Sequence, residues 1–112
     1  MYENVPRRAR RMLVVGSPAG NTGISYEIVL APDGLLIVME SDAARATDIR
    51  RDLSHGGLGD RATVIGGDPR RMLYKLAGPF DVIVCSAAYL STRPILEKLL
   101  APDGVIITND EP

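Results

Sequence analysis

The sequence is poor in aromatic residues and cysteine, and it has no tryptophan. Its 112 residues include one Phe, four Tyr and one Cys. A core of this composition has to be aliphatic. A lone cysteine excludes an internal disulfide, which favours a reducing, cytoplasmic location. The net charge of -1 gives no reason to expect a nucleic-acid or membrane partner.

Long hydrophobic stretches are also missing. No apolar run approaches the about 18 residues that a membrane helix needs, and no apolar stretch of a signal peptide follows the charged N-terminus. A basic cluster, Arg7, Arg8, Arg10 and Arg11, precedes the first apolar run. We interpret it as a solvated segment, because no aromatic residues interleave with it to stack on bases. The length favours one domain over 1–112.

Short apolar segments alternate with amphipathic ones along the chain. The apolar segments are 12–16, 35–39, 62–65, 81–85 and 105–107. They are apolar on both faces, which is typical of strands in a parallel sheet covered on both sides. The spacing of apolar residues between them predicts helices over 24–30, 43–55, 70–76 and 92–100.

Local signals mark the ends of these segments. Asp42 is a suitable N-cap for the second predicted helix, and Pro69 suits the first turn of the third. Segments 31–34 and 101–104 both read Ala-Pro-Asp-Gly and predict turns. Strands that alternate with helices predict an α/β fold with a doubly wound parallel sheet.

A glycine-rich segment follows the first predicted strand. It reads Gly-Ser-Pro-Ala-Gly-Asn-Thr-Gly over 16–23. Glycines let a ligand approach the backbone closely, and the N-terminus of the next helix favours anionic groups. Ligands of doubly wound sheets bind beyond the carboxyl ends of the strands. The segment therefore predicts a nucleotide-like ligand, with a plain tight turn as the alternative.

Glu40 ends the second predicted strand, twenty positions after Gly20. An acid at this position can accept hydrogen bonds from both hydroxyls of a ribose. Together with the glycine segment, it favours ribose binding over a solvated acid. A nicotinamide nucleotide is disfavoured, because Pro18 stands where the dinucleotide fingerprint has its second glycine.

Several segments together resemble class I S-adenosylmethionine-dependent methyltransferases, and among these the small-molecule O-methyltransferases of the catechol and caffeoyl-CoA type. The resemblance is carried, in order, by 12–16 with Gly20, by 31–42, by 57–61 with 67–68, by 78–84 and by 100–107. Each motif is loose, but the ordered series spans about residues 10–110.

This resemblance implies a Rossmann-like sheet of about five strands in the order 3-2-1-4-5. We expect a truncated member, since the family's two further strands and its N-terminal helices have no counterpart. The implied cofactor is S-adenosylmethionine, and the implied activity is methyl transfer to an oxygen of a small molecule. The implied cofactor-binding residues are Gly16, Ser17, Gly20, Asn21, Glu40, Ser41, Gly67, Asp68 and Ser86. Among them, Asp68 would lie beside the adenine.

The sequence departs from the family at positions that matter for catalysis. Val14 stands where the family has an acid near the methionine end of the cofactor. Ser86 replaces a metal-binding aspartate, Ala88 replaces a second acid, and Asn109 with Asp110 reverses an Asp-Asn pair. Because a hard cation prefers several carboxylate oxygens, we expect no Mg²⁺ site. The sequence identifies no general base.

These departures leave two interpretations of the function. In the first, the chain is a methyltransferase that either needs no metal or has a degraded metal site. In the second, it is a catalytically inactive cofactor-binding or assembly module of the same fold. The fifth strand would form an edge of the sheet, and an exposed apolar edge invites association, so we expect a homodimer or another partner contact there. Tyr89 lies on a loop at the ligand end, where it lines a substrate pocket, closes over the adenine or packs on the surface. Cys85 is expected in the core.

Overall fold

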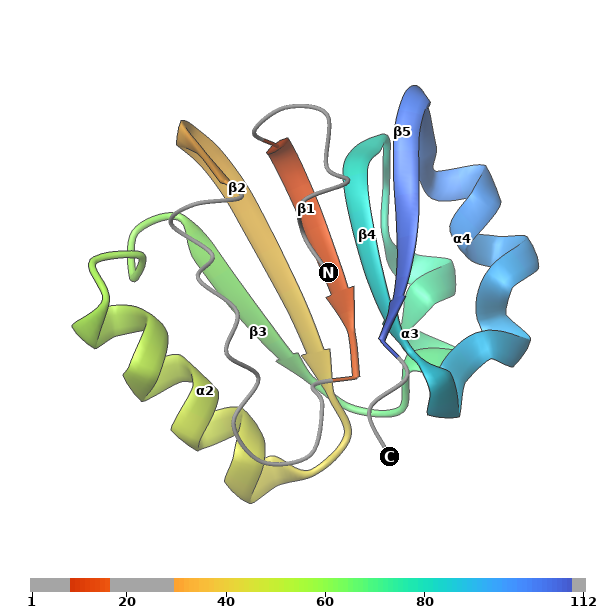
Figure 1. Cartoon of the computed structure of the whole chain (residues 1–112). Coiled ribbons are helices and arrows are strands. Elements are labelled where there is room, and N and C mark those ends of the chain that lie inside the picture. Colours follow the sequence, from red (N-terminus) through yellow and green to blue (C-terminus); the bar gives the residue numbers. More distant parts are fainter. Residues whose placement is uncertain (1–8, 17–29, 110–112) are drawn as a thin grey trace.

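The structure, a computed structural model, describes residues 9–16 and 30–109. Its elements are β1 (Ala9–Val15), β2 (Leu30–Glu40), α2 (Ala43–His55), β3 (Ala62–Gly66), α3 (Pro69–Met72), the 3₁₀ turn η2 (Leu73–Lys75), β4 (Phe80–Ser86), the 3₁₀ turn η3 (Ala87–Thr92), α4 (Arg93–Leu99) and β5 (Leu100–Asn109). The strands form one parallel sheet in the order β3-β2-β1-β4-β5 (Figure 1). The predicted fold class and strand order are confirmed.

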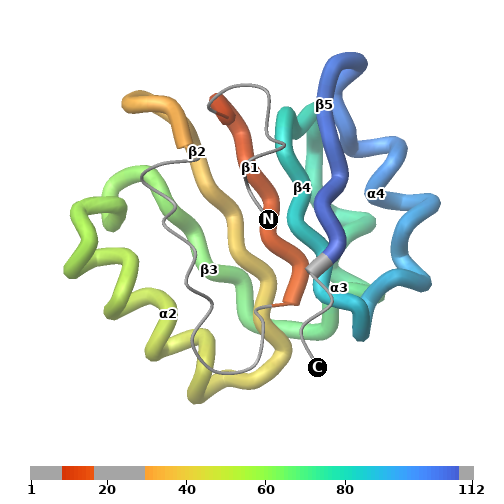
Figure 2. The backbone as a smooth tube through the Cα atoms, viewed as in Figure 1, coloured from red at the N-terminus to blue at the C-terminus, as the bar shows by residue number. Residues whose placement is uncertain are grey.

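The sheet is built outward from β1 in both directions. The chain passes from β1 to β2 and β3 on one side and then crosses to β4 and β5 on the other (Figure 2). Along β1, Met12 and Val14 pack in a cluster with residues of α2, whereas Leu13 and Val15 pack in a second cluster with residues of η2 and α4. All four are fully buried. Both faces of the sheet are therefore covered by helices, as the apolar pattern predicts.

The caps of two helices are confirmed. The α2 helix spans Ala43–His55, as predicted, and the side chain of Asp42 accepts hydrogen bonds from the backbone N–H of Ala44 (2.9 Å) and Arg45 (3.3 Å). Pro69 occupies the first turn of α3. Among the described residues, no helix is both long enough and apolar enough to span a membrane.

The prediction that 31–34 and 101–104 are turns between elements is wrong. Both segments lie inside strands, β2 and β5. The strand register explains how this is possible. Pairing of β1 with β2 jumps from Ala9↔Leu30 to Arg11↔Leu35, so β2 carries three extra residues there while pairing continues on both sides. The Ala-Pro-Asp-Gly sequence therefore forms a bulge in the strand.

The second bulge repeats the first. Pairing of β4 with β5 jumps from Phe80↔Leu100 to Val82↔Val105, again with three extra residues. The helix predicted over 24–30 is wrong at its last residue, because Leu30 begins β2. Its other positions lie outside the described residues.

Two further helix boundaries differ from prediction. The helix predicted over 70–76 is a short α-helix, α3, that tightens into η2. The helix predicted over 92–100 starts at Arg93 and ends at Leu99, because Leu100 already pairs with Phe80. Before it, Ser86 accepts a hydrogen bond from the backbone N–H of Ala88 (3.3 Å) and so caps η3, which the sequence did not predict.

Candidate functional site

The carboxyl ends of the three central strands lie level with one another. Val15 at the end of β1 pairs with Met39 of β2 and with Cys85 of β4. Because parallel strands run in the same direction, the next residue of each strand lies at the same edge of the sheet. These next residues are Gly16, Glu40 and Ser86. This is the edge at which doubly wound sheets bind their ligands.

The third strand brings two more predicted residues to this edge. Glu40 pairs with Gly66, and the backbone N–H of Gly67 donates to the Glu40 carbonyl (3.1 Å). Asp68 follows and caps α3. The structure thus gathers six of the nine predicted residues: Gly16, Glu40, Ser41, Gly67, Asp68 and Ser86. The other three, Ser17, Gly20 and Asn21, lie outside the described residues.

Glu40 places a buried carboxylate at the centre of this edge. Only 5% of the residue is exposed. Its Oε2 accepts a hydrogen bond from the backbone N–H of Asp42 (2.9 Å), and its Oε1 lies 4.0 Å from Nε of Arg45. An ionised carboxylate only accepts hydrogen bonds, so it is suited to the hydroxyls of a ribose. Arg45 was missed because nothing in the sequence distinguishes it from the other arginines.

Gly67 and Asp68 form a tight turn into α3. Gly67 has a φ of 142°, and a Cβ atom there would lie 3.1 Å from Cγ of Met72. Both the backbone conformation and the space therefore favour glycine. Oδ1 of Asp68 accepts from the backbone N–H of Arg70 (3.0 Å) and from its Nη1 (3.4 Å). The role of Asp68 beside an adenine stays a prediction.

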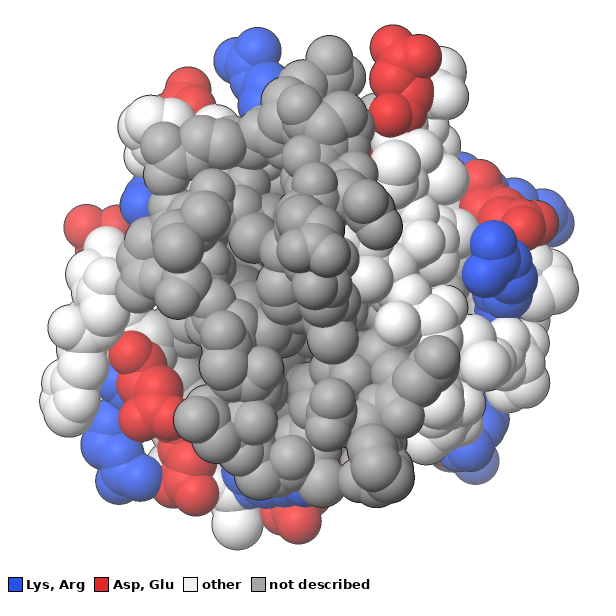
Figure 3. Space-filling view, viewed as in Figure 1, with Lys and Arg blue, Asp and Glu red and all other residues white. Residues whose placement is uncertain are grey.

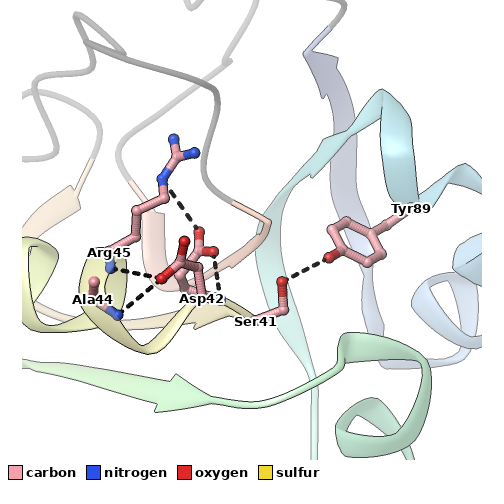
Figure 4. Close-up of polar contacts among 6 residues, drawn as sticks. Ser41, Asp42, Ala44, Arg45 and Tyr89 are labelled. Carbon is pink, nitrogen blue, oxygen red and sulfur yellow. Dashed lines mark hydrogen bonds and ion pairs between the residues drawn. The ribbon is translucent and has the colours of Figure 1, made fainter.

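Gly16 is covered by an aromatic ring. Its φ is 72°, and a Cβ atom there would lie 2.6 Å from Cδ2 and Cε2 of Tyr89 and 3.3 Å from Cβ of Ser86. Position 16 requires glycine for both reasons. Tyr89 is half-buried, and its hydroxyl lies 3.2 Å from Oγ of Ser41 (Figure 4). Tyr89 therefore spans from the end of β4 to the end of β2, across the end of β1.

The hydrophobic core begins directly below this edge. Cys85 is fully buried, which confirms its predicted place in the core. Burial raises the pKa of its thiol, while a hydrogen bond with Thr92 and the charge of Arg93 oppose that rise. The neighbouring Ser86 is half-buried, so the boundary between core and site falls between these two residues.

A metal site finds no support in the part of the chain that the structure describes. Over 9–16 and 30–109, no three His, Cys, Asp or Glu side chains are grouped so that they could hold a metal ion. Asp110 is the one carboxylate that remains among the positions of the family's metal ligands, and it lies outside the described residues. That the protein binds no Mg²⁺ therefore stays a prediction.

No protein-family model matches the sequence. Solved structures do resemble the chain. The O-methyltransferase TomG from Streptomyces achromogenes, in complex with S-adenosylmethionine, is 26% identical with a TM-score of 0.80, over 91% of this chain and 49% of that one. A putative O-methyltransferase from Klebsiella pneumoniae is 28% identical with a TM-score of 0.77, over 89% and 48%.

A third structure gives the same result. The O-methyltransferase from Bacillus cereus, in complex with S-adenosylhomocysteine, is 27% identical with a TM-score of 0.74, over 89% of this chain and 49% of that one. The present chain spans about half the length of each of these proteins. The strand order and these similarities confirm that the chain resembles the class I S-adenosylmethionine-dependent O-methyltransferases, over about nine-tenths of its sequence.

Proposed function

We propose that this chain binds S-adenosylmethionine at the carboxyl edge of its sheet. The observation that carries the proposal is the buried Glu40 carboxylate, level with Gly16 at the point where strand order reverses. Two of the similar structures contain S-adenosylmethionine or S-adenosylhomocysteine. Glu40 fits such a ligand, because an ionised carboxylate accepts hydrogen bonds and ribose hydroxyls can donate them.

Different residues at the edge would contact different parts of the cofactor. Glu40 would accept from the ribose hydroxyls, and Asp68 with Gly67 would lie beside the adenine. Gly16 would allow the ligand to approach the backbone of the β1 end. Ser41 and Ser86, on either side of Gly16, would border the site. Ser17, Gly20 and Asn21 are also proposed to contact the cofactor; they lie outside the described residues.

The proposed reaction is methyl transfer to an oxygen of a small molecule, without a metal. When bound, S-adenosylmethionine would supply an electrophilic methyl group, which would pass from its sulfur to the acceptor oxygen, while the proton of the acceptor hydroxyl would pass to water. The contribution of this chain is to hold the two reactants in line, and positioning of this kind supplies a large share of the rate in bimolecular steps.

A second candidate function is a cofactor-binding or assembly module without catalytic activity. Two observations favour it. Val14, where related enzymes have an acid, is fully buried and apolar. The hydroxyl of Ser86, at the position of a metal-binding aspartate, accepts from the backbone of Ala88. Both observations bear on catalysis and leave the binding of the cofactor untouched.

The edge strand β5 supports a proposal about association. Among the described strands, β5 pairs only with β4, and Val105 and Ile107 are only partly buried. Figure 3, viewed as in Figure 1, shows an area without charged side chains on the side of the molecule where β5 lies. We propose that a second copy of the chain, or a strand of another partner, covers this edge. Sedimentation velocity should show a dimer, and a species that stays monomeric at high concentration would contradict self-association.

Calorimetric titration tests the cofactor proposal. S-adenosylmethionine and S-adenosylhomocysteine should bind with micromolar affinity, whereas NAD should give no heat. Absence of heat with both of the first two ligands would overturn the proposal. Turnover of a catechol with and without Mg²⁺ then separates the enzyme from the inactive module, and Mg²⁺-dependent turnover would show that the metal prediction is wrong.

A further inference from the structure

Tyr89 lies at the centre of the carboxyl edge, among the residues assigned to the cofactor. It belongs to η3, which follows β4. Its backbone carbonyl accepts a hydrogen bond from Oγ of Thr92 (2.6 Å), which fixes the base of the side chain. The side chain itself leaves η3 and points toward Ser41 (Figure 4).

The ring of Tyr89 occupies the space directly above Gly16. Two of its carbons lie 2.6 Å from the position that a Cβ atom of Gly16 would take. That distance is shorter than any normal contact to a side-chain carbon, so the ring approaches this backbone as closely as a glycine allows. A ligand group reaches the Gly16 backbone from this side only if the ring moves away.

Two interactions hold the ring in this place. The Tyr89 hydroxyl and Oγ of Ser41 lie 3.2 Å apart, within hydrogen-bond distance. On the ring, the guanidinium carbon of Arg70 lies 5.1 Å from the ring centre, a cation–π contact. Arg70 is in turn held by Oδ1 of Asp68. The ring is thus tied to the ends of both β2 and β3.

We propose that Tyr89 is a gate of the cofactor site. In its closed position the ring covers Gly16 and the hydroxyl is bonded to Ser41; in its open position the ring leaves the β1 end accessible to the ligand. This inference rests on the proposed function, since it assigns a regulator to that same site. The hydrogen bond to Ser41 is then a latch that competes with ligand binding.

A latch of this kind has a definite effect on affinity. The apparent dissociation constant of a ligand equals its intrinsic value divided by the fraction of open protein. Loss of one neutral hydrogen bond shifts such an equilibrium by about 2- to 10-fold. Removal of the latch should therefore tighten binding by about 2- to 10-fold, whereas removal of a ligand contact would weaken it.

The Tyr89→Phe variant carries the test, because it removes the hydroxyl and keeps the ring. Calorimetry with S-adenosylhomocysteine should show affinity about 2- to 10-fold tighter than in the wild type. The association rate should rise as well, since fewer molecules are closed at encounter. Tyr74→Phe is the matched control: Tyr74 is 74% exposed, and its variant should bind like the wild type.

A double-mutant cycle ties the effect to Ser41. Ser41 is itself a predicted cofactor-binding residue, so Ser41→Ala alone changes both the hydrogen bond to Tyr89 and the predicted contact with the cofactor. In the Ser41→Ala background, however, Tyr89→Phe should cause no further change, because the hydrogen bond is already absent. An equal effect of Tyr89→Phe in both backgrounds would contradict the latch.

The outcomes separate the two proposals. If the wild type binds S-adenosylhomocysteine and Tyr89→Phe binds equally or more weakly, the gate is refuted and the cofactor proposal stands. If neither the wild type nor Tyr89→Ala binds, both proposals are overturned. Urea unfolding of each variant shows whether it is folded, and a destabilised Tyr89→Ala is replaced by Tyr89→Leu.

Discussion

The two edges of the sheet use polar side chains in different ways. At the amino edge, charged side chains bind backbone atoms. Oδ2 of Asp81 accepts hydrogen bonds from the backbone N–H groups of Arg10 (2.6 Å) and Arg11 (3.3 Å), which ties β4 to the start of β1. These contacts hold the start of β1 against β4.

The bulge in β2 is held in the same way. Nη1 of Arg61 donates to the backbone carbonyls of Ala31 (3.1 Å) and Gly34 (3.2 Å). The carbonyls of a bulge lose their regular partners in the sheet, and this side chain, which precedes β3, replaces them. At the amino edge, partly buried backbone groups therefore find side-chain partners.

At the carboxyl edge, Asp42, Asp68 and Ser86 also accept hydrogen bonds from backbone N–H groups, but other polar side chains there contact one another. Ser41 meets Tyr89, and Glu40 faces Arg45 as well as the backbone of Asp42. Such contacts can break without loss of a strand pair. This fold therefore anchors the starts of its strands at one edge and has side-chain contacts that can be rearranged at the other, where the ligand is proposed to bind.

The largest effect should come from Glu40→Gln at the carboxyl edge. This substitution keeps the shape of the side chain and removes its charge. Since hydrogen bonds to a charged group contribute about 1.5–3 kcal/mol, affinity for S-adenosylhomocysteine should fall by about 10- to 150-fold, measured by calorimetry. Glu97→Gln is the control: Glu97 lies in α4, exposed and paired with Arg93, and its loss should leave affinity unchanged.

Unchanged binding in Glu40→Gln would show that the buried carboxylate serves the α2 N-terminus and no ligand. The polar side chains of both edges of the sheet would then serve the structure alone. Equal losses in Glu40→Gln and Glu97→Gln would instead indicate a long-range effect of net charge.

The second effect concerns the amino edge, where glycines are tightly enclosed. A Cβ atom at Gly34 would lie 2.7 Å from the carbonyl oxygen of Ala9, and one at Gly104 would lie 2.9 Å from that of Asp81. Gly34→Ala and Gly104→Ala should each lower the free energy of unfolding by about 1–3 kcal/mol, measured by urea denaturation.

Gly66 at the carboxyl end of β3 is the matched control. A Cβ atom there would have no neighbour within 4 Å, and its φ is not positive. Gly66→Ala should change the free energy of unfolding by less than about 0.5 kcal/mol. A loss as large as that of Gly34→Ala would mean that the two edges are equally constrained.

The smallest effect is the pH dependence due to Cys85, just below the site. Burial raises the pKa of its thiol above the ordinary value of 9.0. The unfolded chain therefore releases this proton near pH 9 while the folded chain retains it, so stability is complete below that pH and falls as the pH rises through it. The contribution lost reaches at most about 1.4 kcal/mol at pH 10.

The difference between the wild type and Cys85→Ala isolates this effect from other groups. Their free energies of unfolding should converge, by urea denaturation, as the pH rises from 8 to 10. Parallel pH profiles would show that water reaches the thiol, and that the carboxyl edge is open deeper into the sheet than its burial indicates.

Much of the fold could be predicted because it depends on local patterns. The two-sided apolar segments located the five strands, and Asp42 and Pro69 located two helix starts. The segments 31–34 and 101–104 were mistaken for turns because Pro and Gly signal a break both in a turn between elements and in a bulge within a strand. Only pairing with a neighbouring strand on both sides shows that the chain continues as a bulged strand.

The strand segments and the aliphatic core followed from periodicity and caps along the chain, whereas the strand order and the candidate site residues followed from the resemblance to a family. Which side chains meet at the carboxyl edge depends on the tertiary structure. Register places Gly16, Glu40 and Ser86 level, and the path of η3 carries Tyr89 across Gly16 to Ser41. That contact joins residues 48 positions apart, a distance that no local pattern spans.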